Sequence, residues 1–267
     1  ICFYQYKLGF MLTIVTLTTD FHGHYVGVMR GVIKSLSPAT EVIDLSTEVE
    51  PFDLKGGAFI LCSSYKYFPK GTVHLVVVDP GVGTSRKAIA IKTKNYVFVG
   101  PDNGVMAPAA EEDGILEVYE VGKGFLEGRE VAPTFNGRDV FAPVAAFLAD
   151  GGDPRELGKQ LHRFERVEFK RTVGGDFVFG EVIYADMFGN LTTSIREQDI
   201  KLSGSMVVTI GEKGFKARRA ETYADGKEGE FIVLLGSAKH YEISLSNGNA
   251  KNSMAARVGD KVTIVRG

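Results

Sequence analysis

Residues 12–21 read Leu-Thr-Ile-Val-Thr-Leu-Thr-Thr-Asp-Phe, and this stretch decides the fold. Its first six residues are apolar or β-branched, which predicts a buried strand that ends before Asp20. The apolar residues of 26–36 then recur with helical spacing, and this segment stops before Pro38. A buried strand followed by a helix is the unit from which parallel sheets are built, so we expect an α/β fold here.

The alternation continues along the first half of the chain. Strands are predicted at 42–45 and 72–78, with a helix from Asp53 to about Tyr67 between them. The remaining predicted elements are a hairpin over 88–91 and 96–99, and a helix over 138–149 in which Pro143 either causes a kink or occupies the first turn. These elements predict an α/β N-terminal domain with a mostly parallel sheet covered on both faces.

The pattern changes after about residue 173. Short β runs separated by turn residues follow, and they predict a smaller, mostly antiparallel β domain. They lie at 177–183, 206–210, 231–235, 241–245 and 261–265. We therefore expect domains at 11–168 and 169–267. Residues 1–10 have no basic region or small-residue cleavage site, so we interpret them as an extension before a natural start at Met11 rather than as a signal peptide.

Composition excludes several classes of protein. The formal net charge of −2 gives no electrostatic reason to expect a nucleic acid or an anionic membrane as partner. No run of about 18 apolar residues is present, so no membrane-spanning segment is expected. Cys2 and Cys62 lie far apart without metal-ligand spacing, and Cys62 stands in an apolar run typical of a buried free thiol. We therefore expect a cytoplasmic protein.

Two aspartates follow predicted strands, where α/β sheets bind ligands. Asp20 could accept two hydrogen bonds from a ribose diol, or it could simply cap a helix or turn. Asp79 opens a glycine-containing loop, and Arg86 could fold back to keep its carboxylate ionised beside a water. The alternative for this pair is a tight turn closed by a surface ion pair. Gly81 and Gly83 lack the third glycine of a dinucleotide fingerprint.

Two further segments offer polar groups. Residues 134–139 precede a predicted helix, where free N–H groups and the Asn136 amide could hold an anion or a water. The segment 186–190 offers a carboxylate, an aromatic ring and an amide. The alternatives are an N-cap box and a Gly-Asn turn. His22 and His24 have a spacing that is only weak evidence for a metal site.

These segments occur together and in order, and the set resembles one known family. Besides the segments already named, it includes Tyr25-Val26-Gly27 and Gly100-Pro101-Asp102-Asn103-Gly104. The chain resembles the SAM hydroxide adenosyltransferases, which form adenosine from S-adenosyl-L-methionine (SAM) and are related to the fluorinase and chlorinase. The resemblance covers the chain from Met11 to Gly267.

This resemblance implies a homotrimer with each site between the N-terminal domain of one subunit and the C-terminal domain of its neighbour. It implies SAM as substrate, with no cofactor and no metal. Asp20 would bind the ribose hydroxyls. The methionine part would be held by Asp186 and Ser237. The adenine would be held by Phe188 and Asn190. The backbone from Asn247 to Ala250 would assist.

The resemblance also implies that Asp79 and Arg86 belong to a water-activating set whose third member is a histidine. The halogenases have another residue at the aspartate position, so Asp79 favours water over halide. This chain departs from the family pattern by carrying Asn136 in place of the histidine, and by a shorter loop over 21–25. Three functions therefore stay open: a SAM hydrolase, a SAM- or adenosine-binding protein with impaired catalysis, and a C5′ halogenase.

Overall fold

The computed structural model describes residues 13–266, so the expected extension, the start at Met11 and Cys2 lie outside the described residues. The chain divides into two compact units, with the division between Arg166 and Val167. No helix within 13–266 is both long and apolar enough to cross a bilayer.

The N-terminal unit alternates strands with helices. Its strands are β1 (Ile14–Thr19), β2 (Glu41–Ser46), β3 (Val73–Val77), β4 (Ala88–Thr93), β5 (Val97–Pro101) and β6 (Ile115–Glu120). Its α-helices are α1 (His24–Leu36), α2 (Leu54–Ser64), α3 (Ala107–Asp113) and α4 (Ala142–Ala149). Asp53 caps α2 by accepting a 2.9 Å hydrogen bond from Gly56 N.

The strands form one six-stranded sheet in the order β2-β1-β3-β5-β4-β6. β1 pairs in parallel with β2 and β3, and β3 pairs in parallel with β5. β4 runs antiparallel to β5 and β6, because the predicted hairpin turns the chain back on itself. The α/β prediction is confirmed, whereas the sheet as a whole is mixed.

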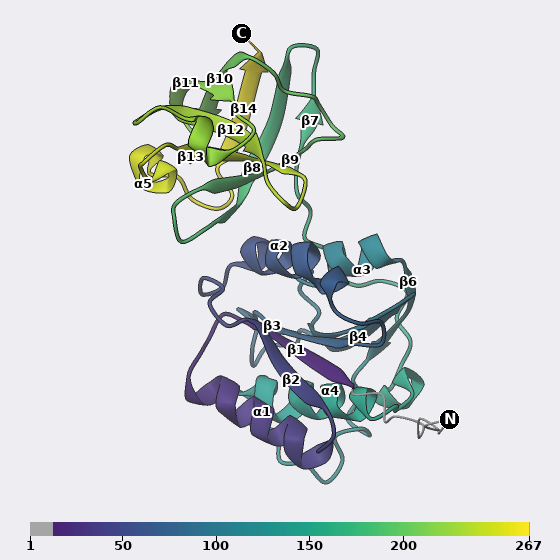
Figure 1. The fold of residues 1–267 in the computed structure, drawn as a ribbon. Helices are drawn as coiled ribbons and strands as arrows, with labels where there is room; N and C mark the ends of the chain where they lie inside the picture. Colours follow the sequence, from purple (N-terminus) through teal and green to yellow (C-terminus); the bar gives the residue numbers. More distant parts are fainter. Residues whose placement is uncertain (1–12, 267) are drawn as a thin grey trace, which may run out of the picture. The chain divides into compact units, whose positions relative to one another are not determined.

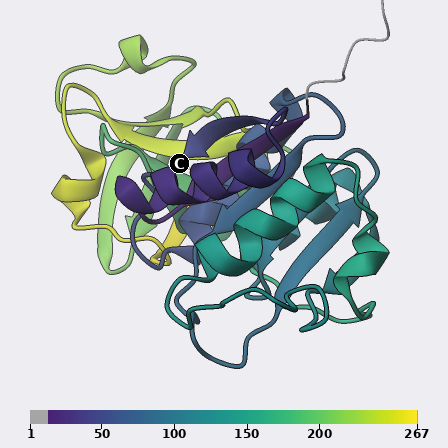
Figure 2. The ribbon, with the colours of Figure 1, turned by 90° about the horizontal axis from the view of Figure 1, so that it is seen from below.

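Helices cover both faces of this sheet, with α2 and α3 on one face and α1 and α4 on the other (Figure 1). Figure 2 shows α1 and α4 side by side. The central strands are buried on both faces for this reason, and Leu17 and Leu75 are fully buried. α4 is apolar almost all round, and Pro143 lies in its first turn, which was one of the two predicted positions.

A wide turn precedes α4. Residues Gly137–Phe141 form a π-helical turn, in which Ala142 N–H bonds to Gly137 O five residues back. This turn joins the segment that contains Asn136 to the buried helix.

The parallel pairing of β1 and β3 positions the site. Thr19 lies opposite Val77 in the register, and each is the last residue of its strand. Asp20 and Asp79 therefore emerge at the same carboxyl edge of the sheet, as parallel strands require.

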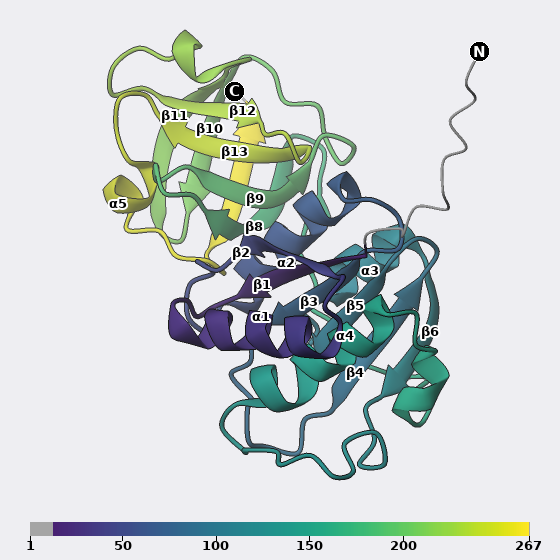
Figure 3. The same ribbon diagram turned by 60° about the horizontal axis from the view of Figure 1, so that its bottom comes forward.

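The C-terminal unit is built of strands around its own core. They are β7 (Thr172–Val173), β8 (Phe177–Ala185), β9 (Leu191–Arg196), β10 (Ser205–Ile210), β11 (Lys213–Arg219), β12 (Phe231–Leu235), β13 (His240–Leu245) and β14 (Lys261–Arg266), with the short helix α5 (Ala250–Met254). β14 pairs with both β10 and β8 and so closes the sheet into a barrel (Figure 3). All pairings are antiparallel except that of β11 with β12, so the predicted β-rich character is confirmed.

The sequence patterns missed several elements: α3, α5, β6, β7, β9 and β11. β9 reads Leu-Thr-Thr-Ser-Ile-Arg, and its hydroxyls hide the apolar signal although Thr193 and Ser194 are buried. Thr193 Oγ1 donates to Tyr241 O at 2.8 Å, which satisfies the buried hydroxyl. In β11 most side chains are charged and Ala217 is the buried residue, so the hydrophobic alternation is weak.

Candidate active site

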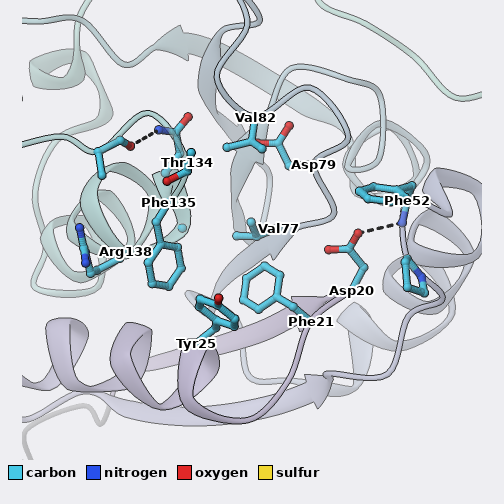
Figure 4. A pocket seen from close by; sticks show the side chains of 14 residues that line it. Asp20, Phe21, Tyr25, Phe52, Val77, Asp79, Val82, Thr134, Phe135 and Arg138 are labelled. Atoms are coloured by element: carbon cyan, nitrogen blue, oxygen red, sulfur yellow. Dashed lines mark hydrogen bonds between the residues drawn. The ribbon is translucent and has the colours of Figure 1, made fainter.

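A pocket of about 520 Å³ lies at the carboxyl edge of the N-terminal sheet. Asp20, Asp79 and Asn136 all line it, so the structure brings three of the predicted site residues together. Figure 4 shows Asp20 and Asp79 on separate sides of the pocket, with Val77 between them.

The loop after β3 folds Arg86 back onto Asp79. Two turns compact the loop: Val82 N bonds to Asp79 O at 3.2 Å, and Thr84 N bonds to Gly81 O at 3.1 Å. A Cβ on Gly81 would lie 3.1 Å from Arg86 Cγ, so the glycine leaves room for the returning side chain. The predicted return of the arginine is therefore present.

Arg86 binds both oxygens of the Asp79 carboxylate. Its Nε donates to Oδ1 at 2.8 Å and to Oδ2 at 3.0 Å, and Nη2 also donates to Oδ2. The Asp79 side chain is 6% exposed and that of Arg86 is 12% exposed, so this is a largely desolvated pair rather than a surface ion pair. Bidentate contact of this kind fixes the orientation of the carboxylate.

Asn136 extends this chain of contacts. Its Oδ1 accepts from Arg86 Nη2 at 2.8 Å, and its Nδ2 donates to Ala132 O at 3.3 Å. The guanidinium also lies over the ring of Phe141, with Cζ 5.0 Å from the ring centroid. Asp79, Arg86 and Asn136 thus form one connected set, in which Asn136 anchors the arginine.

Asp20 is held from the other side of the pocket. Its Oδ2 accepts from Phe52 N at 2.9 Å, and Phe52 has a φ of 66°, in the left-handed region that costs a non-glycine residue free energy. Burial is the main cause that raises the pKa of Asp20, and the nearby charge of Asp79 adds to the rise. The second oxygen of Asp20 faces the pocket in Figure 4.

An aromatic wall, formed by Phe21, Tyr25 and Phe135, closes one side of the pocket (Figure 4). The ring of Tyr25 contacts Phe21 with centroids 6.2 Å apart and Phe135 with centroids 5.3 Å apart, both edge to face. Such rings present π faces that attract cations.

The C-terminal unit has a separate pocket of about 380 Å³, lined by Asp186, Phe188, Asn190 and Asn247 among others. Asp186 closes its own loop, because Oδ1 accepts from Asn190 N at 2.8 Å and Oδ2 accepts from Asn190 Nδ2 at 2.9 Å. The Asn190 amide also carries an acceptor oxygen, and Phe188 is 69% exposed. This pocket therefore offers an aromatic face and an amide acceptor.

Two predicted residues lie outside the lining of this pocket. Ser237 is in the turn between β12 and β13, and Ala250 is the fully buried first residue of α5. Lys251 N donates to Gly189 O at 2.9 Å, so α5 still supports the 186–190 loop.

Sequence reasoning missed two aromatic residues, Phe52 and Tyr223. Phe52 lines the N-terminal pocket and Tyr223 lines the C-terminal one. Tyr223 OH donates to Glu242, whose pKa is raised mainly by burial. Phe52 follows Pro51 in a turn and Tyr223 begins a single 3-10 turn, so no periodicity marks either residue.

Within residues 13–266, no group of three or more His, Cys, Asp or Glu side chains is arranged so that it could hold a metal ion.

The chain matches one family in both units. Residues 15–158 match the SAM hydroxide adenosyltransferase N-terminal domain, and residues 180–263 match the C-terminal domain of the same family.

Named relatives match along almost the whole chain. An (R)-S-adenosyl-L-methionine hydrolase from Methanocaldococcus jannaschii is 34% identical, over 96% of this chain and 97% of that protein. A fluorinase from an Actinoplanes species is 25% identical, over 90% of this chain and 93% of that protein. The solved structure of an uncharacterized conserved protein from Thermotoga maritima has a TM-score of 0.86 at 40% identity, covering 95% of this chain and all of that one.

Proposed function

This chain belongs to the SAM hydroxide adenosyltransferase family, and on that premise we propose that it hydrolyses SAM at C5′ of the ribose to adenosine and L-methionine. One observation of the site carries the proposal. A desolvated Asp79, fixed at both oxygens by Arg86, lines the same pocket as Asp20. This reaction needs one carboxylate to bind the attacking water and another to bind the two ribose hydroxyls.

The reaction is an in-line displacement. Water forms the new bond to C5′ while the bond from C5′ to sulfur breaks, and its electron pair leaves on sulfur. The leaving group is then the neutral thioether of methionine, so it needs no proton. The pocket must align water, C5′ and sulfur, and exclude other water.

Asp79 accepts the proton released by the attacking water. The attacking oxygen becomes a protonated alcohol, which is a strong acid, so even a carboxylate that is paired with Arg86 is basic enough to take its proton. Asn136 exchanges no proton in this scheme. It anchors Arg86 through the 2.8 Å bond to Nη2 and so keeps the pair in place.

Asp20 orients the ribose. One of its oxygens is occupied by Phe52 N, and the other is available to the ribose hydroxyls. The aromatic wall of Phe21, Tyr25 and Phe135 suits the sulfonium, because it is the one part of the pocket with several π faces. No cofactor or metal takes part in the proposed reaction.

The C-terminal pocket has complementary chemistry, which supports the proposal that Phe188 and Asn190 hold the adenine and Asp186 and Ser237 the methionine part. We place these groups in a homotrimer, with each site completed by the C-terminal unit of a neighbouring copy. Backbone between Asn247 and Ala250 would assist at the adenine.

Subunit mixing tests this arrangement. Asp79→Asn and Phe188→Ala proteins, each with low activity, would be mixed in equal amounts under conditions of subunit exchange. With sites shared between copies, about one site in four recombines two intact halves, so about a quarter of the natural activity returns. No recovery after demonstrated exchange would place each site within one chain.

The low cysteine content and the near-neutral net charge support a cytoplasmic protein without nucleic-acid or membrane partners.

Labelled water tests the reaction itself. The purified protein would be incubated with the separated R and S sulfonium epimers of SAM in H₂¹⁸O, and products followed by chromatography and mass. We expect equal adenosine and methionine, ¹⁸O in the adenosine 5′-hydroxyl, and preference for the R epimer for which the relatives are named. A 5′-halo product that depends on halide would instead indicate a halogenase, against which Asp79 argues.

Asn136 supports a second candidate, a SAM- or adenosine-binding protein with impaired catalysis, because asparagine cannot exchange a proton near neutral pH. Single-turnover assays with protein in excess separate the two. A binder returns SAM intact, whereas the hydrolase converts every bound molecule.

A further inference from the structure

The segment Gly100-Pro101-Asp102-Asn103-Gly104 covers the end of β5 and the turn after it, and it lies outside the lining of the N-terminal pocket. Asn103 nevertheless reaches the strand that carries Asp79. Its Nδ2 donates to Val78 O at 2.8 Å, and its Oδ1 accepts from Val105 N at 3.2 Å. One amide side chain thus closes its own turn and binds the backbone directly before Asp79.

Val78 needs this contact because both backbone ladders have ended. The register of β3 with β5 stops at Leu75, and the register of β3 with β1 stops at Val77. The carbonyl of Val78 therefore lies beyond the sheet, and the Asn103 amide provides the hydrogen bond that a neighbouring strand would otherwise provide.

Gly100 allows the turn to approach this closely. A Cβ on Gly100 would lie 2.4 Å from Val76 O, a backbone atom that cannot move aside alone. The glycine thus permits the backbone of β5 to lie against the end of β3.

The same turn also holds the far end of the Asp79 loop. Asp102 N donates to Lys87 O at 2.9 Å, and Arg86 Nη1 donates to the same oxygen at 3.2 Å. Asp102 and Asn103, adjacent in the chain, therefore fix the backbone next to Arg86 and next to Asp79 respectively.

We propose that Asn103 is a positioning residue for hydrolysis, which acts through Val78 to fix the Asp79 carboxylate against Arg86. This inference rests on the proposed function. A side chain that only stabilised the turn would affect folding, whereas Asn103 sets the direction from which Asp79 faces the reacting water. Displacing such a group by about 1 Å lowers the rate about a hundredfold.

Asn103→Asp isolates the contact with Val78. The aspartate keeps an oxygen for Val105 N, so the turn is retained, but it has no N–H for Val78 O. Asn103→Ala removes both side-chain hydrogen bonds without adding a charge beside Asp79. A rate loss that both variants share therefore comes from the lost hydrogen bond and not from repulsion between two carboxylates.

Asn95→Ala is the matched control. Asn95 Nδ2 donates to Asp113 Oδ1 at 2.7 Å within the same unit, in the turn between β4 and β5 and outside the pocket lining. Asn95→Ala loses this side-chain hydrogen bond, which is similar in length to the bond to Val78 O that Asn103→Asp loses.

The variants would be compared by SAM affinity and stoichiometry, single-turnover rate and melting temperature. We expect both Asn103 variants to lower the single-turnover rate about ten- to hundredfold, with binding stoichiometry unchanged and affinity within about threefold. Asn95→Ala should leave the rate unchanged at a similar loss of melting temperature. Equal rate losses at Asn95 and Asn103, or losses in proportion to the unfolded fraction, would overturn the proposal.

A readout independent of turnover separates this proposal from the proposed function. The Arg86 Nε–H, bound to both Asp79 oxygens, should give a protected NMR resonance in the natural protein and in Asn95→Ala. Its loss in both Asn103 variants supports the positioning role even if SAM is returned intact, whereas its persistence overturns that role.

Discussion

Arg86 Nε lies 2.8 and 3.0 Å from the two carboxylate oxygens of Asp79, so a single guanidinium group fixes the whole carboxylate. Asp79→Asn keeps the size of the side chain but cannot accept the proton of the attacking water. We expect kcat to fall about a hundred- to ten-thousandfold while SAM still binds, as measured by steady-state kinetics and calorimetry.

Asp153→Asn is the control for this prediction. Asp153 is also held at both oxygens by an arginine, Arg155, but outside the pocket. Its replacement should leave kcat unchanged. Full activity of Asp79→Asn would exclude Asp79 as the proton acceptor.

Asn136→His should give the rate a new pH dependence. Asn136 accepts a hydrogen bond from Arg86, and an imidazole can do so only while it is neutral. We expect the variant to keep its activity above about pH 7 and to lose it as the imidazole protonates near pH 6.5, whereas the natural protein has no such step there. The pH profile of kcat from 5.5 to 8 measures this, and identical profiles would refute the anchoring role.

Tyr25→Leu should weaken binding of the charged substrate selectively. It removes one π face from the aromatic wall, and we expect SAM affinity to fall about two- to fivefold. S-adenosyl-L-homocysteine, which has no sulfonium charge, should be affected little. Tyr25→Phe retains the ring and is the control. Equal losses for the two ligands would mean that the wall contributes only apolar contact.

Asp20 should make the KM for SAM depend on pH. Burial raises the pKa of its carboxyl group, so Asp20 protonates at a higher pH than an ordinary aspartate. The ionised form accepts hydrogen bonds from the ribose, so KM should rise as the pH falls through this raised pKa. Asp20→Asn should have a high KM that no longer changes over that range. A natural protein with constant KM down to the usual aspartate range would contradict this role.

His74 should make the N-terminal unit less stable in acid. The ring is fully buried and stacks on Phe98, and its Nδ1 forms a 2.8 Å hydrogen bond with Thr16 Oγ1. Burial lowers the pKa of this histidine to about 3. The folded histidine stays neutral while the unfolded one protonates below about pH 6.5, so stability is lost as the pH falls from there.

His74→Phe keeps a ring in this place and removes the titration. The drop in unfolding free energy between pH 7 and pH 5 should be smaller in the variant by about 2 kcal/mol, measured by denaturant unfolding. The same drop in both proteins would show that His74 is not neutral in the fold.

The positions of Asp20 and Asp79 could be predicted because both follow strands of one parallel pair, and parallel strands end at a common edge. The return of Arg86 to Asp79 could be predicted from a short glycine-containing loop. Local sequence sufficed for these three residues, because the ends of two strands position the aspartates and the short loop brings Arg86 back to Asp79.

Phe52, Tyr223 and Asn103 could not be assigned in this way. Phe52 matters through a backbone N–H directed at Asp20, and Asn103 through an amide directed at Val78. Each contact joins segments more than 20 residues apart and depends on backbone conformation, which residue type alone does not reveal. Strand β6 was also missed, because it is defined by its antiparallel pairing with β4, which its own residues do not reveal.

The π-helical turn at Gly137–Phe141 makes the spacing of residues as important as their identity. A wide turn holds one residue more than an α-helical turn, and each residue of an α-helix rotates the next side chain by about 100°. Deleting a single residue there would restore a regular helix and swing Asn136 away from Arg86, although every side chain of the site would still be encoded. The site should therefore tolerate substitutions in this segment but not the insertion or deletion of a residue.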